Sequence, residues 1–332
     1  MLAEEGARWA WLAPDTRGPA MNDRERSRPT GPRFIMVTGA SSGIGQAAAA
    51  RLADAGHVVF GAARRASALD ALAADHPRVR PLVLDVTDRA SIEDARQQVG
   101  TWTAGRGLDV LVNVAGTLVL GPVEAVPEGL IREQFEVNVF GSLAVTRAFL
   151  PPMRERGAGR IVNVSSIMGR FALPGSGLYS ASKFAVEAYS DALRIELAPF
   201  GVRVVLVEPG VIDTPLYELA AASLSGYDEA LEPYRALWTA GFGFPQRLLR
   251  GAASVDGIAA ILAKAVLDPN PRARYRPGLR NRMNTRLLTM LPTRSEDRIK
   301  SRIAGVAKAA EPAKPDAATE RRHRNDPARE RR

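Results

Sequence analysis

The amino-acid sequence predicts an α/β protein in which helices cover both faces of a single doubly wound parallel sheet. Between residues 33 and 267, short strands that are apolar throughout alternate with longer segments of helical pattern, and strands buried on both faces have this composition. The first strand ends in a glycine-rich turn that opens a helix, which is the ligand-binding end of a doubly wound sheet. The spacing of the strands indicates one domain rather than two.

The elements follow one another along the chain. Strands are expected at residues 33–38, 57–61, 79–84, 108–113, 160–164, 202–208 and, as a short last strand, 272–276. Helices are expected at residues 43–55, from about 90 onward, and at 130–153, 178–199 and 255–267. Asp88 is expected to cap the helix that begins near residue 90, because its carboxylate can accept a hydrogen bond from the first helical N–H groups.

The two ends of the chain differ from the middle in composition. Residues 1–32 mix Arg, Asp, Pro and Gly without periodicity, and residues 305–332 have no large apolar side chain after Val306. We therefore expect a disordered leader and a disordered tail beside a domain of residues 33–278. Residues 270–303 hold 10 basic and 2 acidic side chains. We therefore expect a basic amphipathic extension at 279–304, whose part 279–303 either lies on the body or makes a peripheral membrane contact. The sequence contains no nucleic-acid recognition motif, so nucleic-acid binding is not expected.

The composition also excludes several kinds of site. The chain has 332 residues, no cysteine, and three histidines that lie far apart in sequence, so disulfides are excluded and no metal centre is expected. No apolar run reaches the length of a membrane-spanning helix. The first residues lack the positive charge and the apolar stretch of a signal peptide. These observations predict a cytoplasmic protein.

The glycine-rich turn reads Thr38-Gly39-Ala40-Ser41-Ser42-Gly43-Ile44-Gly45. Glycines allow a tight turn in which backbone N–H groups approach a pyrophosphate at the positive end of a helix. The turn also fits the nucleophile elbow of hydrolases, but that triad needs a later histidine, and the only one beyond His76 is His323 in the tail. A nucleotide-hydrolysing P-loop would need a lysine where Gln46 stands.

Further motifs follow in a fixed order, and together with the turn they resemble the short-chain dehydrogenase/reductase family over about residues 33–270. They are Asp85-Val86 after the third strand, Asn113-Val114-Ala115-Gly116 after the fourth, Asn138, Ser166, the pair Tyr179 and Lys183, and Pro209-Gly210-Val211-Ile212-Asp213-Thr214. The resemblance implies a Rossmann fold, an oxidoreductase activity on alcohols or carbonyls, and a homo-oligomer. Val114 replaces the second asparagine of the family motif, which puts a sheet-bracing contact in doubt.

The resemblance implies that Asn138, Ser166, Tyr179 and Lys183 are the catalytic residues. Tyr179 and Lys183 lie four residues apart, so they share one face of a helix, and a nearby ammonium lowers the pKa of a tyrosine from about 10. Tyr179 is then the acid/base, and Ser166 orients the substrate oxygen, with neighbouring Ser165 the less suitable choice. The family implies that Lys183 also binds the nicotinamide ribose and that Asn138 holds a relay water.

The second strand predicts the cofactor. Sites that prefer NAD place an acid at the end of this strand to bind the ribose 2′-hydroxyl. Here no acid is present, Ala62 stands in its place, and Arg64 follows. Because a guanidinium suits a phosphate, with Ser41 able to add a hydrogen bond, NADP is expected and NAD is the less suitable alternative. A solvated charged turn at Arg64 and Arg65 is the alternative without function.

The expected cofactor contacts are Gly39, Ser41, Ser42, Gly43, Ile44, Gly45, Arg64, Asp85, Val86, Asn113, Ala115, Gly116, Tyr179, Lys183, Pro209, Gly210, Ile212 and Thr214. Aromatic and aliphatic residues gather between positions 214 and 253 and again at 168–174. They predict either an apolar pocket for a lipid-, steroid- or retinoid-like alcohol or ketone, or ordinary core packing. Two alternatives remain, a 3-oxoacyl-thioester reductase and a catalytically silent NADP-binding sensor or scaffold.

Overall fold

The computed structural model describes residues 31–212, 220, 226–235, 253–278 and 291–303. By its internal contacts the chain divides at Pro32, and the following description concerns the unit that begins at Arg33. Its strands are β1 (Phe34–Thr38), β2 (Val58–Ala63), β3 (Val79–Val83), β4 (Val110–Asn113), β5 (Gly159–Val164), β6 (Val202–Val207) and β7 (Arg274–Tyr275). All six pairings are parallel, in the order β3-β2-β1-β4-β5-β6-β7. The predicted doubly wound sheet is confirmed.

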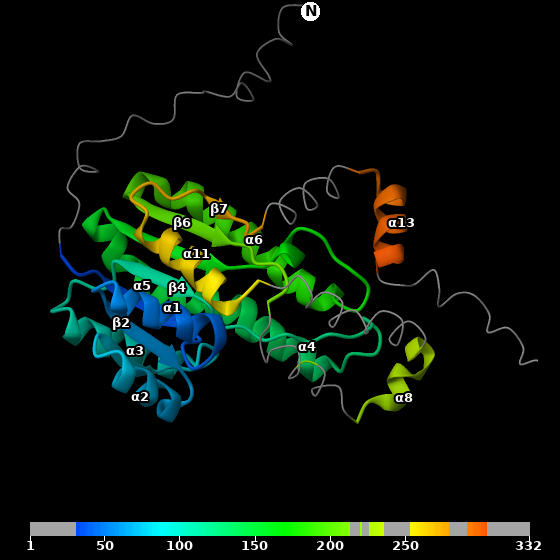
Figure 1. Cartoon of the computed structure of the whole chain (residues 1–332), viewed down its shortest axis with the longest axis horizontal. Helices are drawn as coiled ribbons and strands as arrows, with labels where there is room; N and C mark the ends of the chain where they lie inside the picture. The colour runs from blue at the N-terminus through cyan, green and yellow to red at the C-terminus, as the bar shows by residue number, and fades with distance from the viewer. Residues whose placement is uncertain (1–30, 213–219, 221–225, 236–252, 279–290, 304–332) are drawn as a thin grey trace, which may run out of the picture. The chain divides into compact units, whose positions relative to one another are not determined.

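The helices with described residues are α1 (Gly43–Asp54), α2 (Ala66–Asp75), α3 (Arg89–Trp102), α4 (Glu128–Phe135), α5 (Ser142–Arg156), α6 (Gly177–Leu197), α8 (Asp228–Leu231), α11 (Val255–Leu267) and α13 (Thr293–Ile303) (Figure 1). Shorter turns are the π-helical η4 (Glu136–Gly141) and the 3-10 segments η5 (Ile167–Gly169), η6 (Ala198–Phe200) and η7 (Glu232–Tyr234). Within these ranges no helix is long and apolar enough to cross a membrane.

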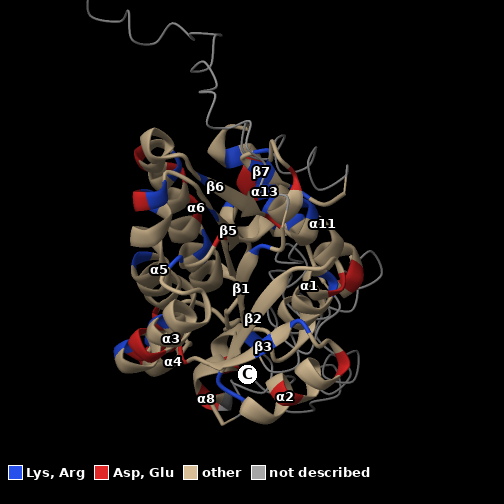
Figure 2. Cartoon of the chain, turned by 90° about the vertical axis from the view of Figure 1, so that its left-hand side faces the viewer, with Lys and Arg blue, Asp and Glu red and all other residues tan. Residues whose placement is uncertain are grey.

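Three layers are visible along the strands in Figure 2, with α1, α2 and α11 on one side of the sheet and α3, α5 and α6 on the other. Each face has its own buried cluster. One contains Val37 of β1 with Leu52 of α1 and Leu262 of α11. The other contains Phe60 of β2 and Phe149 of α5. Because strand side chains alternate between faces, apolar strands of this kind supply both cores at once.

Two helical features depart from the prediction. Helix α2 is not among the predicted elements, although Leu69 and Leu72 give it a buried stripe at helical spacing. The helix expected at residues 130–153 extends over 128–156, but its middle is the π-helical segment η4. One extra residue per turn does not change the apolar pattern much, so periodicity alone does not reveal it.

The capping predictions can be checked directly. The Asp88 carboxylate accepts a hydrogen bond from the Ala90 N–H at 2.9 Å and caps α3, as expected. At the C-terminal end of α11, the carbonyl oxygens of the last turn receive side-chain donors: Arg160 Nη1 lies 2.7 Å from the Ala265 oxygen, and Arg33 Nη1 lies 2.9 Å from that of Val266. These cations suit the negative end of the helix dipole, and they tie α11 to β1 and β5.

Of the basic extension, residues 279–290 lie outside the described residues. The described remainder contains α13, with Leu291 just before it packed against Phe171 and Leu173. This contact agrees with packing on the body at that residue. The disordered leader and tail, the domain limits and the membrane contact stay predictions.

Candidate active site

The backbone of the turn between β1 and α1 lies so close to other backbone atoms of the protein that side chains would not fit there. Gly39 has φ 71° and Gly43 has φ 54°, a region that favours glycine. A Cβ on Gly45 would lie 2.2 Å from the Gly39 carbonyl oxygen, and a Cβ on Gly39 would lie 3.0 Å from the Ala115 Cα. The three glycines therefore form a cradle of bare backbone at the carboxyl end of the sheet.

The N-terminus of α1 is open to a ligand. Ser42 occupies the N-cap position without a side-chain cap hydrogen bond, and the first turn holds no acidic residue. Unsatisfied N–H groups and the positive end of the helix dipole favour an anion at this point. The cradle and this terminus fit a pyrophosphate.

The end of β2 shows why no acid binds the ribose. The strand is longer than expected, so Ala63, rather than Ala62, is its last residue. Arg65 Nη2 lies 3.2 Å from the Ser41 carbonyl oxygen. The Thr87 backbone N–H lowers the pKa of Asp85, and the charge of Arg64 adds to this effect. Arg65, which sequence reasoning passed over, thus reaches the glycine turn itself.

The segment after β4 serves the sheet as well as the site. The Asn113 side chain donates to Thr146 Oγ1 at 3.0 Å and to Asn163 Oδ1 at 2.9 Å. Thr38 Oγ1 accepts hydrogen bonds from the backbone N–H groups of Val114 and Ala115 at 3.0 and 3.1 Å. Asn113, Thr38 and the Val114 backbone thus brace this segment against the sheet. The Asn113 amide nitrogen is thus engaged inside the fold, and the role of Asn113 as a cofactor contact stays a prediction.

Asn138 lies in the π-helical segment and is almost fully buried. Its amide accepts from the Thr117 N–H at 2.8 Å, donates to the Thr117 carbonyl at 2.9 Å, and donates to Ser182 Oγ at 3.1 Å. Such bulges in helices often accompany functional sites. Here the bulge directs one amide toward both the loop after β4 and helix α6.

Lys183 and Tyr179 lie in the first two turns of α6, as the spacing predicts. Lys183 Nζ lies 5.8 Å from the centre of the Tyr179 ring and donates to the Val164 carbonyl at the end of β5 at 3.1 Å. A Cβ placed on Gly116 would lie 3.1 Å from Asn138 Oδ1 and 3.8 Å from Lys183 Nζ. The structure thus brings Asn138, Tyr179 and Lys183 together at one end of the sheet.

The Lys183 ammonium is held in a buried environment. Burial lowers the pKa of Lys183 to about 8, and the carboxylate of Glu187 acts in the opposite direction. Desolvation disfavours the charged form of a lysine. A lysine with this pKa still carries its charge for most molecules at neutral pH and can favour the phenolate form of the neighbouring tyrosine.

The two serines after β5 have different surroundings. Ser166 is the N-cap of η5, and its Oγ accepts from the Met168 N–H at 3.1 Å. The hydroxyl of Ser165 lies instead beneath the loop, 2.8 Å from the position a Cβ would take on Gly169. Helix α6 packs against η5, which brings the Ser166 loop to the helix that carries Tyr179. These positions support Ser166 as the partner of Tyr179.

The loop after β6 closes the site from another side. The Pro209 carbonyl accepts from the Ile167 N–H at 2.9 Å, and Ile212 forms a parallel bridge with Ala253. Gly210 lies between these two contacts. Thr214 lies outside the described residues, as does most of the stretch between 214 and 253.

The substrate side is partly described. Phe171 and Leu173 form a buried cluster with Ile167, Met168 and Leu291, so the segment that follows Ser166 has an apolar lining. Tyr234 of η7 donates its hydroxyl hydrogen to Glu124, which lies after β4. The segment after Ser166 thus packs against Leu291, and the loop after β4 contacts η7.

Comparisons with known proteins agree with this arrangement. A family model described as short chain dehydrogenase matches residues 33–223, and the chain belongs to this family. It is 37% identical over 248 residues to the 3-ketodihydrosphingosine reductase of Bacteroides thetaiotaomicron, covering 74% of this chain and 88% of that protein. It is 33% identical over 272 residues to the NADPH-dependent 3-dehydrocapnine reductase of Ornithobacterium rhinotracheale, covering 80% and 95%.

Among solved structures, a short chain dehydrogenase from Burkholderia cenocepacia in complex with NADP matches with a TM-score of 0.63 and 26% identity, over 82% of this chain and 98% of that one. The protein is thus a short-chain dehydrogenase/reductase, an oxidoreductase that acts on alcohol or carbonyl groups with an NAD(P) cofactor. The bare glycine cradle and the uncapped α1 terminus fit that cofactor. Within the described residues no cluster of potential metal ligands occurs.

Proposed function

We propose that the protein is an NADP-dependent oxidoreductase that interconverts an apolar secondary or primary alcohol and its ketone or aldehyde. The observation that carries this proposal is the placement of a buried Lys183 beside Tyr179, within reach of Asn138 and the end of β5. A tyrosine next to a buried ammonium is a proton donor and acceptor suited to neutral pH.

The catalytic side chains have different tasks. Tyr179 donates its proton to the carbonyl oxygen in reduction and removes the hydroxyl proton in oxidation. Lys183 favours the phenolate of Tyr179 and binds the cofactor ribose, Ser166 orients the substrate oxygen, and Asn138 holds a water that relays protons to Lys183. When bound, the nicotinamide supplies or accepts the hydride.

The preference for NADP rests on the end of β2. Neither Ala62 nor Ala63 has a side chain that can accept a hydrogen bond from a ribose 2′-hydroxyl, and two arginines follow directly. Guanidinium groups recognise phosphate oxygens through paired hydrogen bonds. The NADPH-dependent relative and the NADP complex support the same choice.

The substrate class rests on the apolar cluster around Phe171 and Leu173. Apolar walls with few polar groups take substrates whose bulk is hydrocarbon. The relative that reduces 3-ketodihydrosphingosine supports a ketone on a long apolar chain. A 3-oxoacyl-thioester reductase remains the alternative within the family, and a silent NADP-binding sensor remains the alternative outside it.

A substrate panel tests this proposal. NADPH oxidation is followed with a long-chain β-hydroxy or β-amino ketone, a short-chain ketone of the same head, and a 3-oxoacyl thioester. We expect the long-chain ketone to have the highest kcat/KM, because burying each methylene contributes about 0.8 kcal/mol. A preference for the thioester would favour the alternative reductase, and no turnover of any carbonyl would favour the sensor.

Leu291 provides a matched variant for the panel. Leu291→Ala removes apolar surface from the cluster beside Ser166, so we expect kcat/KM for the long-chain ketone to fall about tenfold and that for the short ketone to change little. Ile299→Ala removes a similar side chain from α13 outside that cluster and should leave both unchanged.

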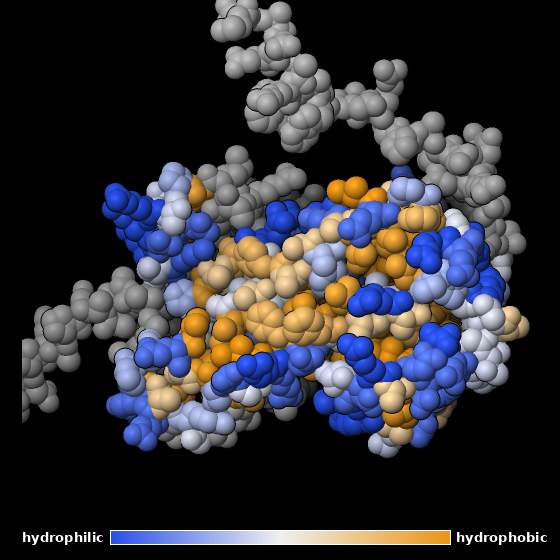
Figure 3. Space-filling model, turned by 180° about the vertical axis from the view of Figure 1, so that it is seen from behind, coloured by the Kyte–Doolittle hydropathy of each residue, from blue (hydrophilic) through white to orange (hydrophobic). Residues whose placement is uncertain are grey.

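We also propose a homo-oligomer formed through the layer of α5 and α6. Figure 3 looks onto this layer, and an apolar band crosses it between polar margins. Exposed large apolar side chains on η4 and α6 include Phe140, Phe184 and Ile195. Contiguous exposed apolar surface of this kind is typical of protein interfaces.

A further inference from the structure

A cluster of buried charges lies behind the catalytic lysine, and none of its members belongs to the set predicted from the sequence. Glu187 follows Lys183 by one helical turn in α6 and is only 4% exposed, and Glu208, at the end of β6, is fully buried. A buried carboxylate without a counter-ion is strongly unfavourable. The structure therefore has to supply cations for both.

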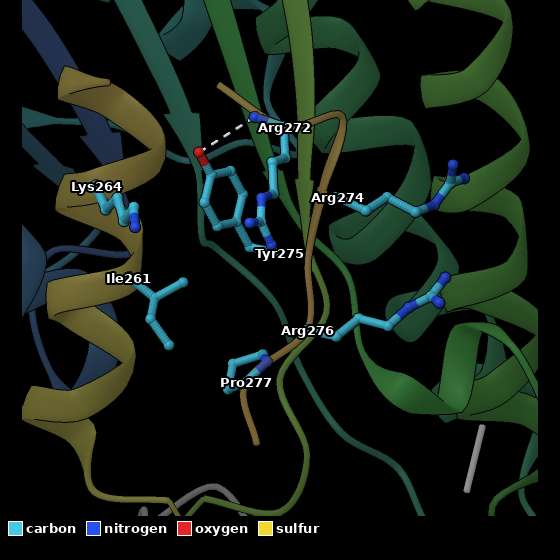
Figure 4. A pocket seen from close by; sticks show the side chains of 7 residues that line it. All are labelled: Ile261, Lys264, Arg272, Arg274, Tyr275, Arg276 and Pro277. Carbon is cyan, nitrogen blue, oxygen red and sulfur yellow. Dashed lines mark hydrogen bonds between the residues drawn. The ribbon is translucent and has the colours of Figure 1, made fainter. Parts of the chain in front are cut away.

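Arg274 of β7 supplies most of that charge. Its Nη2 lies 3.1 Å from Glu187 Oε2 and 2.6 Å from Asp191, and its Nε lies 2.9 Å from Glu208. Arg276 forms a second ion pair with Glu208. Figure 4 shows the side chains of Arg274 and Arg276 extending away from α11, whereas the Tyr275 ring between them points toward α11. All three residues line one cavity with Ile261 and Lys264. Strand alternation thus assigns the two arginines to the α6 face.

The cluster contacts three of the segments that surround the proposed site. A Cβ on Gly169, in the turn after Ser166, would lie 3.1 Å from Glu187 Cγ and 3.1 Å from the Lys183 carbonyl oxygen. Glu208 directly precedes Pro209, whose carbonyl receives the Ile167 N–H. Helix α6, the Ser166 loop and the loop after β6 therefore meet around one arginine and two carboxylates.

Glu187 interacts with Lys183 on its own helix and with three polar or charged groups from elsewhere, Ser165, Glu208 and Arg274. Burial and the neighbouring Glu208 raise the pKa of Glu187, while Ser165 and Arg274 oppose that rise. Only Oε2 of Glu187 is held by Arg274, and Oε1 has no hydrogen-bond partner within the described residues. Arg274 consequently leaves part of the carboxylate charge to act on Lys183.

We propose that Glu187 is a positioning residue for the reaction: its buried carboxylate, anchored by Arg274, keeps the Lys183 ammonium charged so that Tyr179 can exchange its proton. Asp191 pairs with the same arginine, but its side chain is 40% exposed and lies two turns from Lys183. Its charge is screened by solvent and anchors the arginine only. This inference rests on the catalytic roles proposed above for Tyr179 and Lys183.

The small number of lysines allows a direct test. The chain contains five, Lys183, Lys264, Lys300, Lys308 and Lys314, so the full-length protein labelled with ¹³C at lysine Cε gives a short NMR titration, with Lys183 assigned by Lys183→Ala. We expect the Lys183 midpoint to fall by about one pH unit in Glu187→Gln, since a unit charge one helical turn away acts through a low effective dielectric. Asp191→Asn should leave it unchanged.

Activity supplies the second arm. In Glu187→Gln the alkaline limb of kcat/KM for NADPH-dependent reduction should move to lower pH by the same amount, and Glu187→Asp should restore most of it. If Glu187→Gln does not fold, Glu187→Asp is titrated instead, and a smaller fall of the Lys183 midpoint is expected. An unchanged midpoint in the folded variant, or an equal fall in Asp191→Asn, would overturn the proposal. The titration needs no substrate, so its failure is distinct from failure of the proposed function.

Discussion

Arg64 and Arg65 show how two adjacent residues of one kind can take different positions. Both follow the last residue of β2, but the Arg65 guanidinium lies at the Ser41 carbonyl while Arg64 faces Asp85. We therefore test the two arginines together as the proposed partners of a 2′-phosphate.

The double substitution Arg64→Ala/Arg65→Ala is expected to reduce the preference for NADPH over NADH by about ten- to a hundredfold, because each hydrogen bond to a charged group contributes about 1.5–3 kcal/mol. The measurement is the ratio of kcat/KM for the two cofactors with one ketone. Arg51→Ala, an exposed arginine in the last turn of α1, is the control. An unchanged ratio in the double variant would refute recognition of the phosphate by this pair.

The resemblance to the family was sufficient to single out Tyr179, Lys183 and Ser166, and the four-residue spacing of the first two places them on one helix face. The charge partners of Lys183 could not be predicted in this way. In the sequence, Glu187 is one more polar residue of a helix. Its contact with Arg274 of β7 joins residues 87 positions apart. Local sequence spacing does not indicate ion pairs between residues so far apart.

Helix α6 has two different faces. Its inner face carries Tyr179, Lys183 and Glu187, and its outer face exposes Phe184 and Ile195. Helix α6 was predictable from its own helical pattern. The segments η4 and α5 were predictable only as parts of the long helix that precedes it. The π-helical turn that directs Asn138 inward was not, because its cause lies in the contacts with Thr117 and Ser182.

Ile195→Asp is expected to convert the oligomer to monomer, since a charge in an apolar interface has no partner there. Light scattering after size-exclusion chromatography measures the mass. Because Ile195 is 74% exposed, thermal stability of the monomer should change little. Trp102→Asp alters an exposed apolar residue of α3, near the β3 edge of the same layer (Figure 2), and should leave the mass unchanged. A wild-type monomer, or an unchanged mass for Ile195→Asp, would contradict an interface on α6.

At the scale of the whole molecule, the doubly wound parallel sheet was predictable, because apolar strands that alternate with helices are typical of a sheet covered on both faces. The cofactor cradle, the proton-transfer residues and the apolar cluster lie on different segments that meet at the carboxyl ends of the strands. Leu291, far along the chain, packs against the turn that follows Ser166, a contact that no local pattern indicates. Because these groups lie on different segments, we expect that a mutation can abolish proton transfer without abolishing cofactor binding.

Tyr179→Phe tests that separation most directly. The substitution removes only the hydroxyl group, while the glycine cradle, the α1 terminus and Lys183 remain in place. We expect kcat with a ketone to fall by at least about a hundredfold, since general acid catalysis contributes about 10²–10⁴, and the Kd for NADPH measured by fluorescence titration to change less than about threefold, well below the effect of losing a charged hydrogen bond. Turnover at the wild-type rate would contradict the assignment of Tyr179 as the acid/base.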